Sequence, residues 1–293
     1  MINEFLQYLQ YEKNYSSHTV LSYRNDLNQF CIFLQTEQQL FNPDSISALQ
    51  IQQWILSLLE NKISARTLSR KISTLKSFWH FLQRRGLTKQ NPTLKIVLPK
   101  TNKALPAFFK QKEMEAALDE TFLPDNFEAL RNHTIIATFY ATGIRRSELI
   151  NIKDTDIDLN EGTLKVTGKR NKQRIIPISK QFCSTIENYL QKRNKEITDR
   201  SDFLFIKNDG QPLYAKMVYN IVNNTMTDFG SLHKNSPHVL RHTFATGLLN
   251  EGADINAVKE LLGHSSLAAT QVYTHTSFDE LHNIYKQAHP RAK

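Results

Sequence analysis

The clearest hydrophobic pattern in the chain lies between Ser64 and Gly86. Apolar side chains recur there at steps of four and three residues, at Leu68, Ile72, Leu75, Trp79 and Leu82. This spacing predicts an amphipathic helix that buries one face. Polar positions follow the same rhythm two residues earlier, and at about 100° per residue they fall on the opposite side of the helix. They are Arg66, Arg70, Ser73, Ser77, His80 and Arg84.

Three further helices are predicted before this one. The first two span residues 3–11 and 19–34, and the third is opened by Pro43 and runs to about Glu60. In the third helix the periodicity turns four apolar side chains inward, those of Ile51, Ile55, Leu58 and Leu59.

Four helices in succession predict a small helical domain over residues 1–87. Beyond it, prolines at positions 92, 99 and 106 interrupt a basic stretch. Proline disfavours helix in the residue before it, so residues 88–107 are interpreted as a linker.

Residues 108–293 combine helical and strand patterns. Helices are predicted over residues 112–120 and 127–141, around 148–150, and over much of the chain after Ser184. Two apolar runs, at 163–167 and 174–178, flank the basic sequence GKRNK and predict a β-hairpin. The fold class is therefore mainly α with a small β component (α+β).

Composition narrows the class of protein further. With 293 residues, 40% hydrophobic and 22% charged, the chain is long enough for about two folded domains and is not disordered throughout. Its longest nearly uncharged apolar stretch, residues 134–144, falls short of the ~20 residues that a membrane span needs. The start lacks a basic segment followed by an apolar one, and Cys31 and Cys183 form no CxxC pair. We therefore expect a cytoplasmic protein with no membrane partner.

The positive charge is concentrated near the N-terminal half. Residues 1–103 carry 13 Lys or Arg and 6 Asp or Glu, a net +7 of the total +9. Residues 61–112 contain thirteen basic residues and no acidic one. A helix face that only contacts solvent normally carries both positive and negative side chains. Binding to a lipid surface would need an apolar face rich in Trp or Phe, and none is evident nearby. A nucleic acid is therefore the favoured partner.

Five short sequence blocks follow in the second part of the chain. They are ATGIRRSEL at 141–149, GK at 168–169 in the hairpin turn, PHVLRHTFAT at 237–246, LLGHSS at 261–266 and TQVYTH at 270–275. Each polar residue in them, taken alone, is most often an ion-pair partner, a cap or a core edge. In this order and spacing, however, the blocks resemble those of the tyrosine site-specific recombinases (the λ-integrase family), and most closely the bacterial Xer recombinases. The resemblance extends over nearly the whole chain.

The resemblance implies a role for each matched position. Arg145 and Arg241 correspond to the two arginines that bind the scissile phosphate, and His238 to the histidine of the His-x-x-Arg motif. Lys169 corresponds to the hairpin lysine, His264 to the position held by His or Trp, and Tyr273 to the nucleophile. One position departs from the Xer pattern, because Arg170 replaces the second glycine of a usual Gly-Lys-Gly turn. The extra cation is a candidate DNA contact that also bears on the direction of Lys169.

These residue types suit phosphodiester cleavage. The reaction develops negative charge on the non-bridging oxygens, and arginine binds such oxygens bidentately while remaining charged. A tyrosine with an ordinary pKa near ~10 needs a proton acceptor or nearby cations to become a nucleophile. His238 is the candidate acid or base, and Lys169 is the candidate donor to the leaving 5′-oxygen. A 3′-phosphotyrosine would conserve the bond energy, so the chemistry needs no ATP.

Two other chemistries are disfavoured. The nearest match to a P-loop, Gly162 with Gly168-Lys169, is one residue too long and has Arg170 where Ser or Thr should stand. A zinc site would use His238, His242, His264 and His275, but no cysteine or acidic group completes a recognisable ligand set. We therefore expect neither a metal nor a cofactor.

The resemblance also implies an architecture and partners. It predicts a four-helix DNA-binding domain of the SAM-like core-binding type and a mixed α/β catalytic domain, residues 108–293, which together form a C-shaped clamp on DNA. The helical face at Arg66 to Arg84 and Arg170 would contact DNA. The implied partners are a double-stranded recombination site, further recombinase subunits in a homo-oligomer or in a hetero-tetramer with a paralogue, and a DNA translocase of the FtsK type. The implied duty is resolution of chromosome dimers through a Holliday junction; an integrase of a mobile element and a catalytically silent DNA-binding module are the alternatives.

Overall fold

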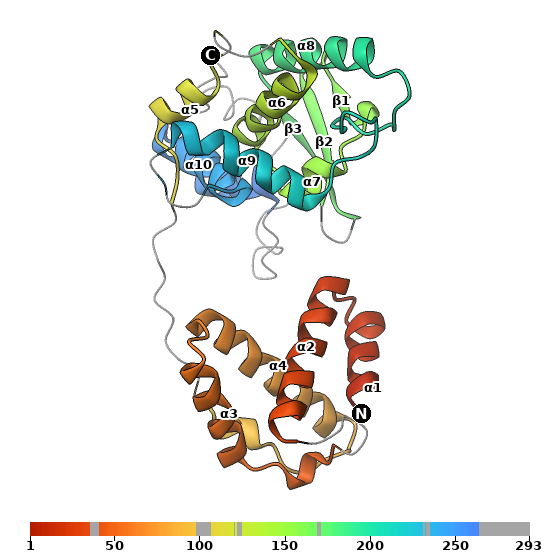
Figure 1. Cartoon of the computed structure of the whole chain (residues 1–293), viewed down its shortest axis with the longest axis vertical. Helices are drawn as coiled ribbons and strands as arrows, with labels where there is room; N and C mark the ends of the chain where they lie inside the picture. The colour runs from red at the N-terminus through yellow and green to blue at the C-terminus, as the bar shows by residue number, and fades with distance from the viewer. Residues whose placement is uncertain are drawn as a thin grey trace. The chain divides into compact units, whose positions relative to one another are not determined.

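The computed structural model divides the chain into two compact units, Met1–Ala104 and Leu105–Lys293 (Figure 1). It describes residues 1–35, 41–97, 107–119, 121, 125–168, 171–230, 232 and 235–263. Four of the predicted site residues, Lys169, Arg170, His264 and Tyr273, lie outside the described residues. Among the described residues no helix is both long and apolar enough to cross a membrane.

The first unit is helical. Its long helices are α2 (Ser17–Phe33), α3 (Ala48–Glu60) and α4 (Ala65–Arg84), and α1 (Ile2–Gln7) continues into a π-helical turn, Tyr8–Glu12. Serine starts all three long helices, since the side chains of Ser16, Ser47 and Ser64 each accept a hydrogen bond from a backbone N–H in the first turn. Aromatic side chains fill the space between the helices: Phe5, Phe30, Trp54, Phe78 and Trp79 are each at most 2% exposed.

Helix α4 matches its predicted pattern. Leu68, Ile72, Leu75, Trp79 and Leu82 are all buried. Of the six polar positions, Arg66, Arg70, Ser73, His80 and Arg84 are exposed and Ser77 is half-buried. The predicted separation of an apolar and a polar face is therefore present in the structure.

The prediction for α3 was wrong at its start and in part of its inward face. Pro43 opens only a short 3-10 turn, Pro43–Ser45, and the helix begins at Ala48. Ser47 forms a capping box with Gln50 and Ile46 is extended, which ends the first turn before the helix starts. Leu59 is 49% exposed, and Trp54 takes the buried position instead.

A buried polar cluster joins α2 to α4. The carboxylate of Asp26, 1% exposed, accepts hydrogen bonds from Lys71 Nζ at 3.0 Å, Thr74 Oγ1 at 2.9 Å and the guanidinium of Arg70. Lys71 is itself 4% exposed, so the two buried charges neutralise each other. Arg70 is exposed on the outer face of α4, and its guanidinium is held there by the hydrogen bond to the buried Asp26.

The first unit continues past residue 87. Pro92–Lys95 forms a 3-10 turn against α3 and α4, Ile96 is buried in the same core, and the carbonyl of Ile96 accepts a hydrogen bond from Lys76 Nζ at 2.9 Å. Residues 92–96, which the prolines suggested as linker, therefore pack as part of this unit.

The second unit is arranged around α6 (Phe127–Thr142), which is buried along most of its length. Helix α8 (Lys180–Glu196) packs on one side of it, and α9 (Ala215–Phe229) and α10 (Pro237–Asn250) pack on another (Figure 1). The shorter helices are α5 (Gln111–Ala117), α7 (Arg146–Ile150) and α11 (Ile255–Leu262), and a 3-10 turn, Asp154–Asp156, follows α7.

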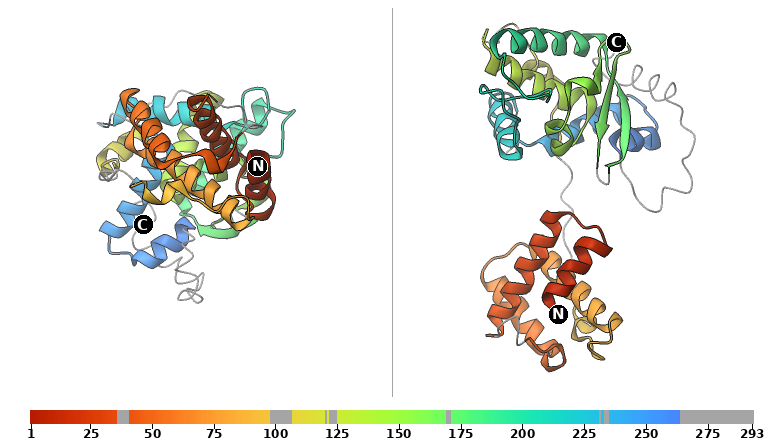
Figure 2. Two further views of the ribbon diagram at one scale, coloured as in Figure 1. Left: turned by 90° about the horizontal axis from the view of Figure 1, so that it is seen from below. Right: turned by 90° about the vertical axis from the view of Figure 1, so that its right-hand side faces the viewer.

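Three antiparallel strands complete this unit. The order is β1 (Ile157–Asp158), β2 (Thr163–Thr167) and β3 (Gln173–Pro177), and Leu164 of β2 pairs with Ile157 of β1 and Ile176 of β3. The hairpin of β2 and β3 was predicted, and β1 was not. In the right-hand view of Figure 2 the strands lie beside the segment of α10 and α11, and a hydrogen bond from Arg174 of β3 to the carbonyl of Leu261 joins the two.

Candidate active site

Arg145 is positioned by a tight connection between α6 and α7. Gly143 ends α6 in the left-handed conformation, with φ 58°, and Arg145 is the N-cap of α7. A Cβ atom at Gly143 would lie 2.3 Å from Phe244 Cδ1, so a side chain has no space there. Glycine thus satisfies both the backbone conformation and the close contact with α10.

A buried carboxylate holds the Arg145 guanidinium. Glu148 Oε1 accepts a hydrogen bond from Arg145 Nη1 at 2.8 Å, and Oε2 accepts one from the backbone N–H of Arg145 at 2.8 Å. Arg174 donates to the same two oxygens from Nη1 at 3.0 Å and Nη2 at 2.9 Å. Burial would raise the pKa of Glu148, but the hydrogen bonds and charges of Arg174 and Arg145 outweigh burial and hold that pKa below its ordinary value.

Arg241 lies in α10 and is 6% exposed. Its guanidinium donates to two backbone carbonyls, from Nη1 to Gly143 at 2.7 Å and from Nη2 to Leu262 at 2.7 Å. Burial, followed by the nearby charge of Arg145, lowers the pKa of Arg241 to about 10, so this arginine stays protonated at neutral pH.

The end of α11 brings the arginines together. Three consecutive carbonyls accept one hydrogen bond each: Leu261 from Arg174 Nε at 2.7 Å, Leu262 from Arg241, and Gly263 from Arg145 Nη2 at 2.8 Å. Carbonyls at a helix C-terminus lack partners within the helix and carry partial negative charge. The helix end therefore supplies a natural anchor for three cations.

Arg145 and Arg241 keep donors for a ligand. A guanidinium has five N–H groups, and each of these two side chains uses two of them in the contacts above. The side chain of Arg145 is also 33% exposed. The pair can therefore bind the non-bridging oxygens of a phosphate without giving up its anchors.

His238 lies in the first turn of α10, directly after Pro237, and is exposed. Its pKa is lowered first by desolvation of the imidazole and then by neighbouring positive groups, namely His242, Arg146, Arg241 and Arg145. The imidazole is therefore neutral at neutral pH and can accept a proton. It lies within electrostatic range of Arg145 and Arg241.

For Lys169 and His264, the structure describes only the glycine that precedes each of them. Gly168 precedes Lys169, and its N–H donates to the carbonyl of Lys172 at 2.8 Å across the base of the hairpin turn. Gly263 precedes His264 and ends α11 with φ 62°. The structure thus brings Arg145 and Arg241 together with His238 in their electrostatic range, and Gly168 and Gly263 lie close to the Glu148–Arg174 pair.

The sequence reasoning missed Glu148 and Arg174 as parts of this site. Glu148 carried a local signal, since it stands three residues after Arg145 and its side chain accepts from the Arg145 N–H in a capping box. Arg174 carried none beyond its place next to the hairpin turn. Its partners are 26 and 87 residues distant in the sequence, so only the tertiary structure connects them.

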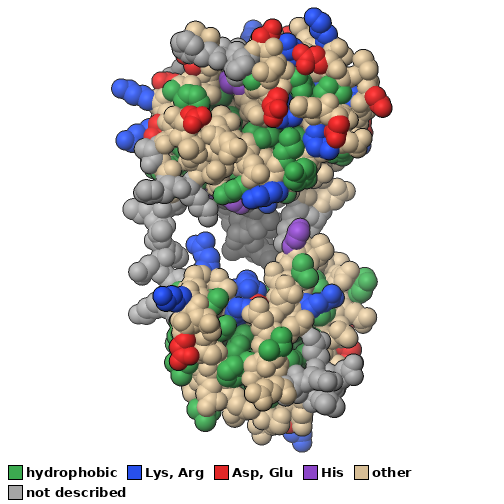
Figure 3. Space-filling view, in the orientation of Figure 1, with side chains coloured by type: hydrophobic (Ala, Val, Ile, Leu, Met, Phe, Trp, Pro, Cys, Tyr) green, Lys and Arg blue, Asp and Glu red, His purple; other side chains and the backbone are tan. Residues whose placement is uncertain are grey.

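The first unit presents the second group of candidates. On the face drawn in Figure 3, Lys and Arg side chains of this unit are more frequent than Asp and Glu. Ser73 Oγ donates to the carbonyl of Ser69 at 2.8 Å, and Arg84 Nη1 donates to Tyr8 Oη at 3.4 Å, so these two side chains on the outer face of α4 are held by hydrogen bonds.

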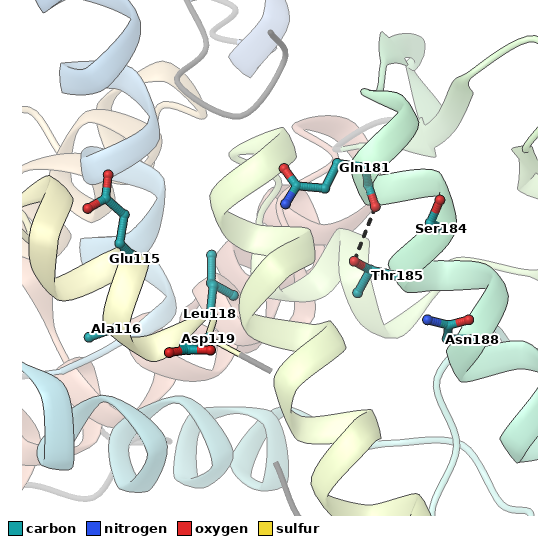
Figure 4. Close-up of a pocket in the computed structure, with 8 residues that line it drawn as sticks. All are labelled: Glu115, Ala116, Leu118, Asp119, Gln181, Ser184, Thr185 and Asn188. Atoms are coloured by element: carbon teal, nitrogen blue, oxygen red, sulfur yellow. Dashed lines mark hydrogen bonds between the residues drawn. The ribbon is translucent and has the colours of Figure 1, made fainter. Parts of the chain in front are cut away.

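A groove elsewhere in the second unit is lined by acidic and neutral side chains, unlike the arginine-rich site. It lies between α5 and α8, has a volume of about 540 Å³, and is lined by Glu115, Ala116, Leu118, Asp119, Gln181, Ser184, Thr185 and Asn188 (Figure 4). The side chain of Thr185 donates to the carbonyl of Gln181 at 3.2 Å, one turn back on α8. With two carboxylates and no cation in its lining, the groove is unsuited to a phosphate. Among the described residues no group of three His, Cys, Asp or Glu side chains is placed to hold a metal ion.

Comparisons with known proteins agree with this geometry. The model of the phage integrase family matches residues 107–280, and that of the phage integrase N-terminal SAM-like domain matches residues 2–86. The chain is 42% identical over 290 residues to a tyrosine recombinase XerC of Staphylococcus epidermidis, an alignment that covers 99% of this chain and 97% of the relative. It is 40% identical over 295 residues to a tyrosine recombinase XerC of Oceanobacillus iheyensis, with coverage of 99% and 96%.

Solved structures share the fold. XerH recombinase bound to its difH substrate has a TM-score of 0.69 at 22% identity, with coverage of 97% of this chain and 83% of that one. The Tn1549 transposon integrase in complex with transposon right end DNA has a TM-score of 0.71 at 20% identity, with coverage of 95% and 96%. The chain belongs to the phage integrase family. Within that family it is a tyrosine recombinase of the Xer type, an enzyme that cleaves and rejoins DNA.

Proposed function

We propose that this recombinase resolves chromosome dimers at cell division, by exchanging strands at a short, nearly palindromic DNA site through a Holliday junction. The observation that supports it most is the convergence of Arg145 and Arg241 at the end of α11, with guanidinium donors still available and His238 within their electrostatic range. Full-length likeness to proteins named XerC supports this duty over that of a mobile-element integrase. A catalytically silent binding module would not need the matched residues at all.

In the proposed mechanism Arg145 and Arg241 bind the scissile phosphate. Each directs its uncommitted N–H groups to a non-bridging oxygen, and both charges offset the negative charge that develops in the transition state. The carbonyl and carboxylate anchors hold the two guanidinium groups before DNA arrives. These two guanidinium groups are therefore positioned before DNA binds, which lowers the cost of reorganisation.

Tyr273 is proposed as the nucleophile and His238 as its proton acceptor. The hydroxyl oxygen attacks phosphorus, its proton passes to the neutral imidazole, and the bond to the 5′-oxygen breaks. The products are a 3′-phosphotyrosine and a 5′-hydroxyl strand end. A 5′-hydroxyl of the partner strand reverses the same steps, so no external energy source enters.

Lys169 is proposed to donate the proton that the leaving 5′-oxygen takes up, and His264 to donate a hydrogen bond to the phosphate. Arg170, next to Lys169 in the hairpin turn, is proposed as an additional DNA contact. Support for these roles comes from their sequence neighbours, since Gly168 and Gly263 lie against the Glu148–Arg174 pair beside Arg145.

The outer face of α4 is proposed to hold the DNA backbone. Its members are Arg66, Arg70, Ser73, Ser77, His80 and Arg84. Cations and hydroxyl groups of this kind bind phosphates without reading base sequence, and they make binding dependent on salt. The proposed DNA-binding part is made of the helices in residues 1–87 together with residues 92–96, which pack against them. The rest of residues 88–107 is proposed as the linker and residues 108–293 as the catalytic part.

Strand exchange between two sites requires several subunits. We propose a tetramer on DNA, made of this chain alone or of this chain with a paralogous recombinase, acting in the cytoplasm and activated by a DNA translocase of the FtsK type. The XerH and Tn1549 proteins, which share this fold, were determined in complexes with DNA, and this supports action on a DNA site.

The variant Tyr273→Phe tests the proposed chemistry. It removes one oxygen and keeps the ring, so DNA binding should stay within about three-fold of wild type, with an unchanged salt dependence. The DNA site is first identified by capturing the protein covalently on genomic DNA. The substrate is a duplex with this site and a nick beside the cleavage position. The nick lets the short cleaved strand diffuse away, so the covalent adduct cannot be reversed. Wild type should form the adduct and the variant should form none.

Mass spectrometry of the peptide that stays attached to the DNA after protease digestion identifies the residue linked to the DNA. It should fall on Tyr273 and not on Tyr285, the next tyrosine in the sequence. An adduct that persists in Tyr273→Phe, or one mapped to another residue, would contradict the assignment.

A further inference from the structure

Arg174 makes three contacts that no part of the phosphate chemistry requires. Its Nη1 and Nη2 donate to the two oxygens of Glu148 at 3.0 and 2.9 Å, and its Nε donates to the carbonyl of Leu261 at 2.7 Å. All three nitrogens of the guanidinium are thus engaged within the protein. The side chain is 16% exposed and that of Glu148 is 1% exposed, so the pair is largely shielded from solvent.

The same carboxylate transmits this contact to Arg145. Glu148 binds Arg145 through both the side-chain Nη1 and the backbone N–H, each at 2.8 Å. Two guanidinium groups therefore share one carboxylate, and the position of Glu148 between them depends on both. Loss of the Arg174 fork would leave Glu148 free to rotate about its side-chain bonds and to carry Arg145 Nη1 with it.

Two glycines show how closely the surrounding chain is packed on this pair. A Cβ atom at Gly168 would lie 3.1 Å from Glu148 Oε1, and one at Gly263 would lie 3.1 Å from Arg174 Nη1 and 3.3 Å from its Cζ. Gly168 is the residue before Lys169, and Gly263 is the residue before His264. The Glu148–Arg174 pair therefore lies against the glycines that precede Lys169 and His264.

We propose that Arg174 is a positioning residue for DNA cleavage: it fixes the Arg145 guanidinium through Glu148, and it fixes the end of α11 through Leu261. The inference rests on the proposed function, since it assumes that Arg145 binds the scissile phosphate. Lysine cannot replace this residue, because one ammonium group cannot donate in the fork geometry to two carboxylate oxygens and also reach a carbonyl on another element.

The test measures cleavage and affinity separately in Arg174→Lys. The probe is the nicked duplex with the site captured by the wild-type protein, used at saturating concentration in single-turnover reactions. The cleavage rate should fall by about 10- to 100-fold, as a small misplacement of a catalytic group does. The dissociation constant for the same duplex should stay within about three-fold, because the phosphate contacts of α4 are untouched.

Arg193→Lys is the matched control. Arg193 is also buried, forks onto a carboxylate, Asp154, at 2.8 and 2.9 Å, and donates to a carbonyl, that of Leu204, at 2.7 Å. It belongs to the same unit but contacts none of the site residues through these bonds. Arg193→Lys should lower the thermal unfolding temperature, while the cleavage rate of the folded protein stays within about two-fold of wild type.

A double variant identifies the route. If Arg174 acts through Glu148, the combination of Arg174→Lys with Glu148→Gln should be about as slow as the slower single variant, because both remove the same alignment. Losses that multiply would overturn this route. Arg174→Gln keeps one donor and adds no unpaired charge, so it serves as a second single variant if the lysine prevents folding.

The outcomes separate the two proposals. A wild-type protein that forms an adduct on Tyr273, together with an Arg174→Lys variant that cleaves at the wild-type rate, would overturn the positioning role alone. Equal slowing of Arg174→Lys and Arg193→Lys would also overturn it, since any lost fork would then have the same effect. A wild-type protein that forms no tyrosine adduct would overturn the proposed function and this inference with it.

Discussion

Arg145 and Arg241, the two arginines proposed to bind the scissile phosphate, are held in different ways. Arg145 shares a carboxylate with Arg174, whereas the Arg241 guanidinium donates to the backbone carbonyls of Gly143 and Leu262. Both carbonyls lie at helix ends, where partial negative charge stabilises a cation by typically 0.3–1 kcal/mol and does not neutralise it. Arg241 therefore remains a full positive charge in a buried position, which is the property that a phosphate-binding group needs.

A first prediction concerns Gly143, which ends α6 directly beside Arg145. Gly143→Ala should destabilise the folded protein by about 2–4 kcal/mol, because the left-handed backbone is strained with a side chain and the new methyl group meets Phe244 and Leu262. Urea unfolding followed by circular dichroism measures the free energy. The carbonyl of Gly143 also holds Arg241, so cleavage by the remaining folded protein should fall as well.

Gly247→Ala is its control. Gly247 lies inside α10, and a Cβ there would meet nothing within 4 Å. Since alanine favours a helix over glycine, this variant should be neutral or more stable by up to about 1 kcal/mol. Equal destabilisation by both substitutions would show that the close contact of Gly143 with Phe244 does not cause the loss of stability.

A second prediction concerns pH and His238. The pKa of His238 in the folded protein lies below its ordinary value of 6.5, chiefly because the imidazole is desolvated. As pH falls through 6.5, the unfolded chain therefore takes up this proton before the folded protein does. Stability should decrease over that range and down to the lowered pKa, and His238→Gln should remove this part of the decrease. Urea unfolding between pH 5 and 8 tests it.

Nuclear magnetic resonance titration of the ring adds a second check. The pKa of His238 should rise when a nicked duplex binds, because the phosphate between the arginines opposes their positive charge. A pKa at or above 6.5 in the free protein would contradict the electrostatic description of the site.

At the scale of helices and strands, the success of the sequence analysis depended on sustained periodicity. Helix α4 has five apolar positions in register and the second half of α6 is uncharged and mostly apolar, so both were predicted within a residue or two. The start of α3 was missed because Pro43 is an equally good start for a 3-10 turn, and the decision lay in the capping box of Ser47. The two-residue strand β1 has too little pattern to detect at all.

The polar face of α4 carries the third prediction. Arg66→Ala and Arg84→Ala should each weaken DNA binding, and each should reduce the slope of log Kd against log salt by about 1, because each arginine displaces a counterion from a phosphate. Both side chains are exposed, so helix stability should change little. Fluorescence anisotropy over a range of salt concentrations gives the slope.

Lys195→Ala serves as the control for net charge. It lies exposed in the last turn of α8, on the second unit, and removes the same charge from the protein. The slope should be unchanged in this variant. A similar change of slope in all three variants would mean that overall charge, and not the α4 face, governs binding.

On the scale of the whole molecule, each unit has a core of its own. One core gathers around Phe5, Phe30 and Trp54, and the other around Phe139, Tyr189 and Phe205. The charge is divided unequally as well, since residues 1–103 carry 13 basic and 6 acidic residues. The sequence alone supported this division into a strongly basic helical part and a mixed part. It did not connect Glu148, Arg174 and Leu261, because no periodic pattern relates residues so far apart.

The fourth prediction is that cleavage proceeds without a divalent metal. In the proposed mechanism Arg145 and Arg241 supply the positive charge that a metal ion would bring to the phosphate. Both carboxylate oxygens of the neighbouring Glu148 already accept hydrogen bonds from arginine donors. Adduct formation on nicked DNA should therefore continue in excess EDTA at an unchanged rate. Complete loss in EDTA that Mg²⁺ restores and a polyamine does not would contradict this mechanism.

The end of α11 holds three arginines through backbone carbonyls, and a residue of any type has a backbone carbonyl. Natural variation at Leu261 and Leu262 can therefore change the side chains without removing the contact, and a comparison of substituted sequences would find no partner that varies together with Arg174 or Arg241 at these positions. Alanine scanning of the helix end would likewise measure only the packing of the leucines. The contribution of the carbonyls would become visible only when the backbone itself is changed, for example by replacing the peptide bond between Leu262 and Gly263 with an ester, whose carbonyl is a weaker acceptor.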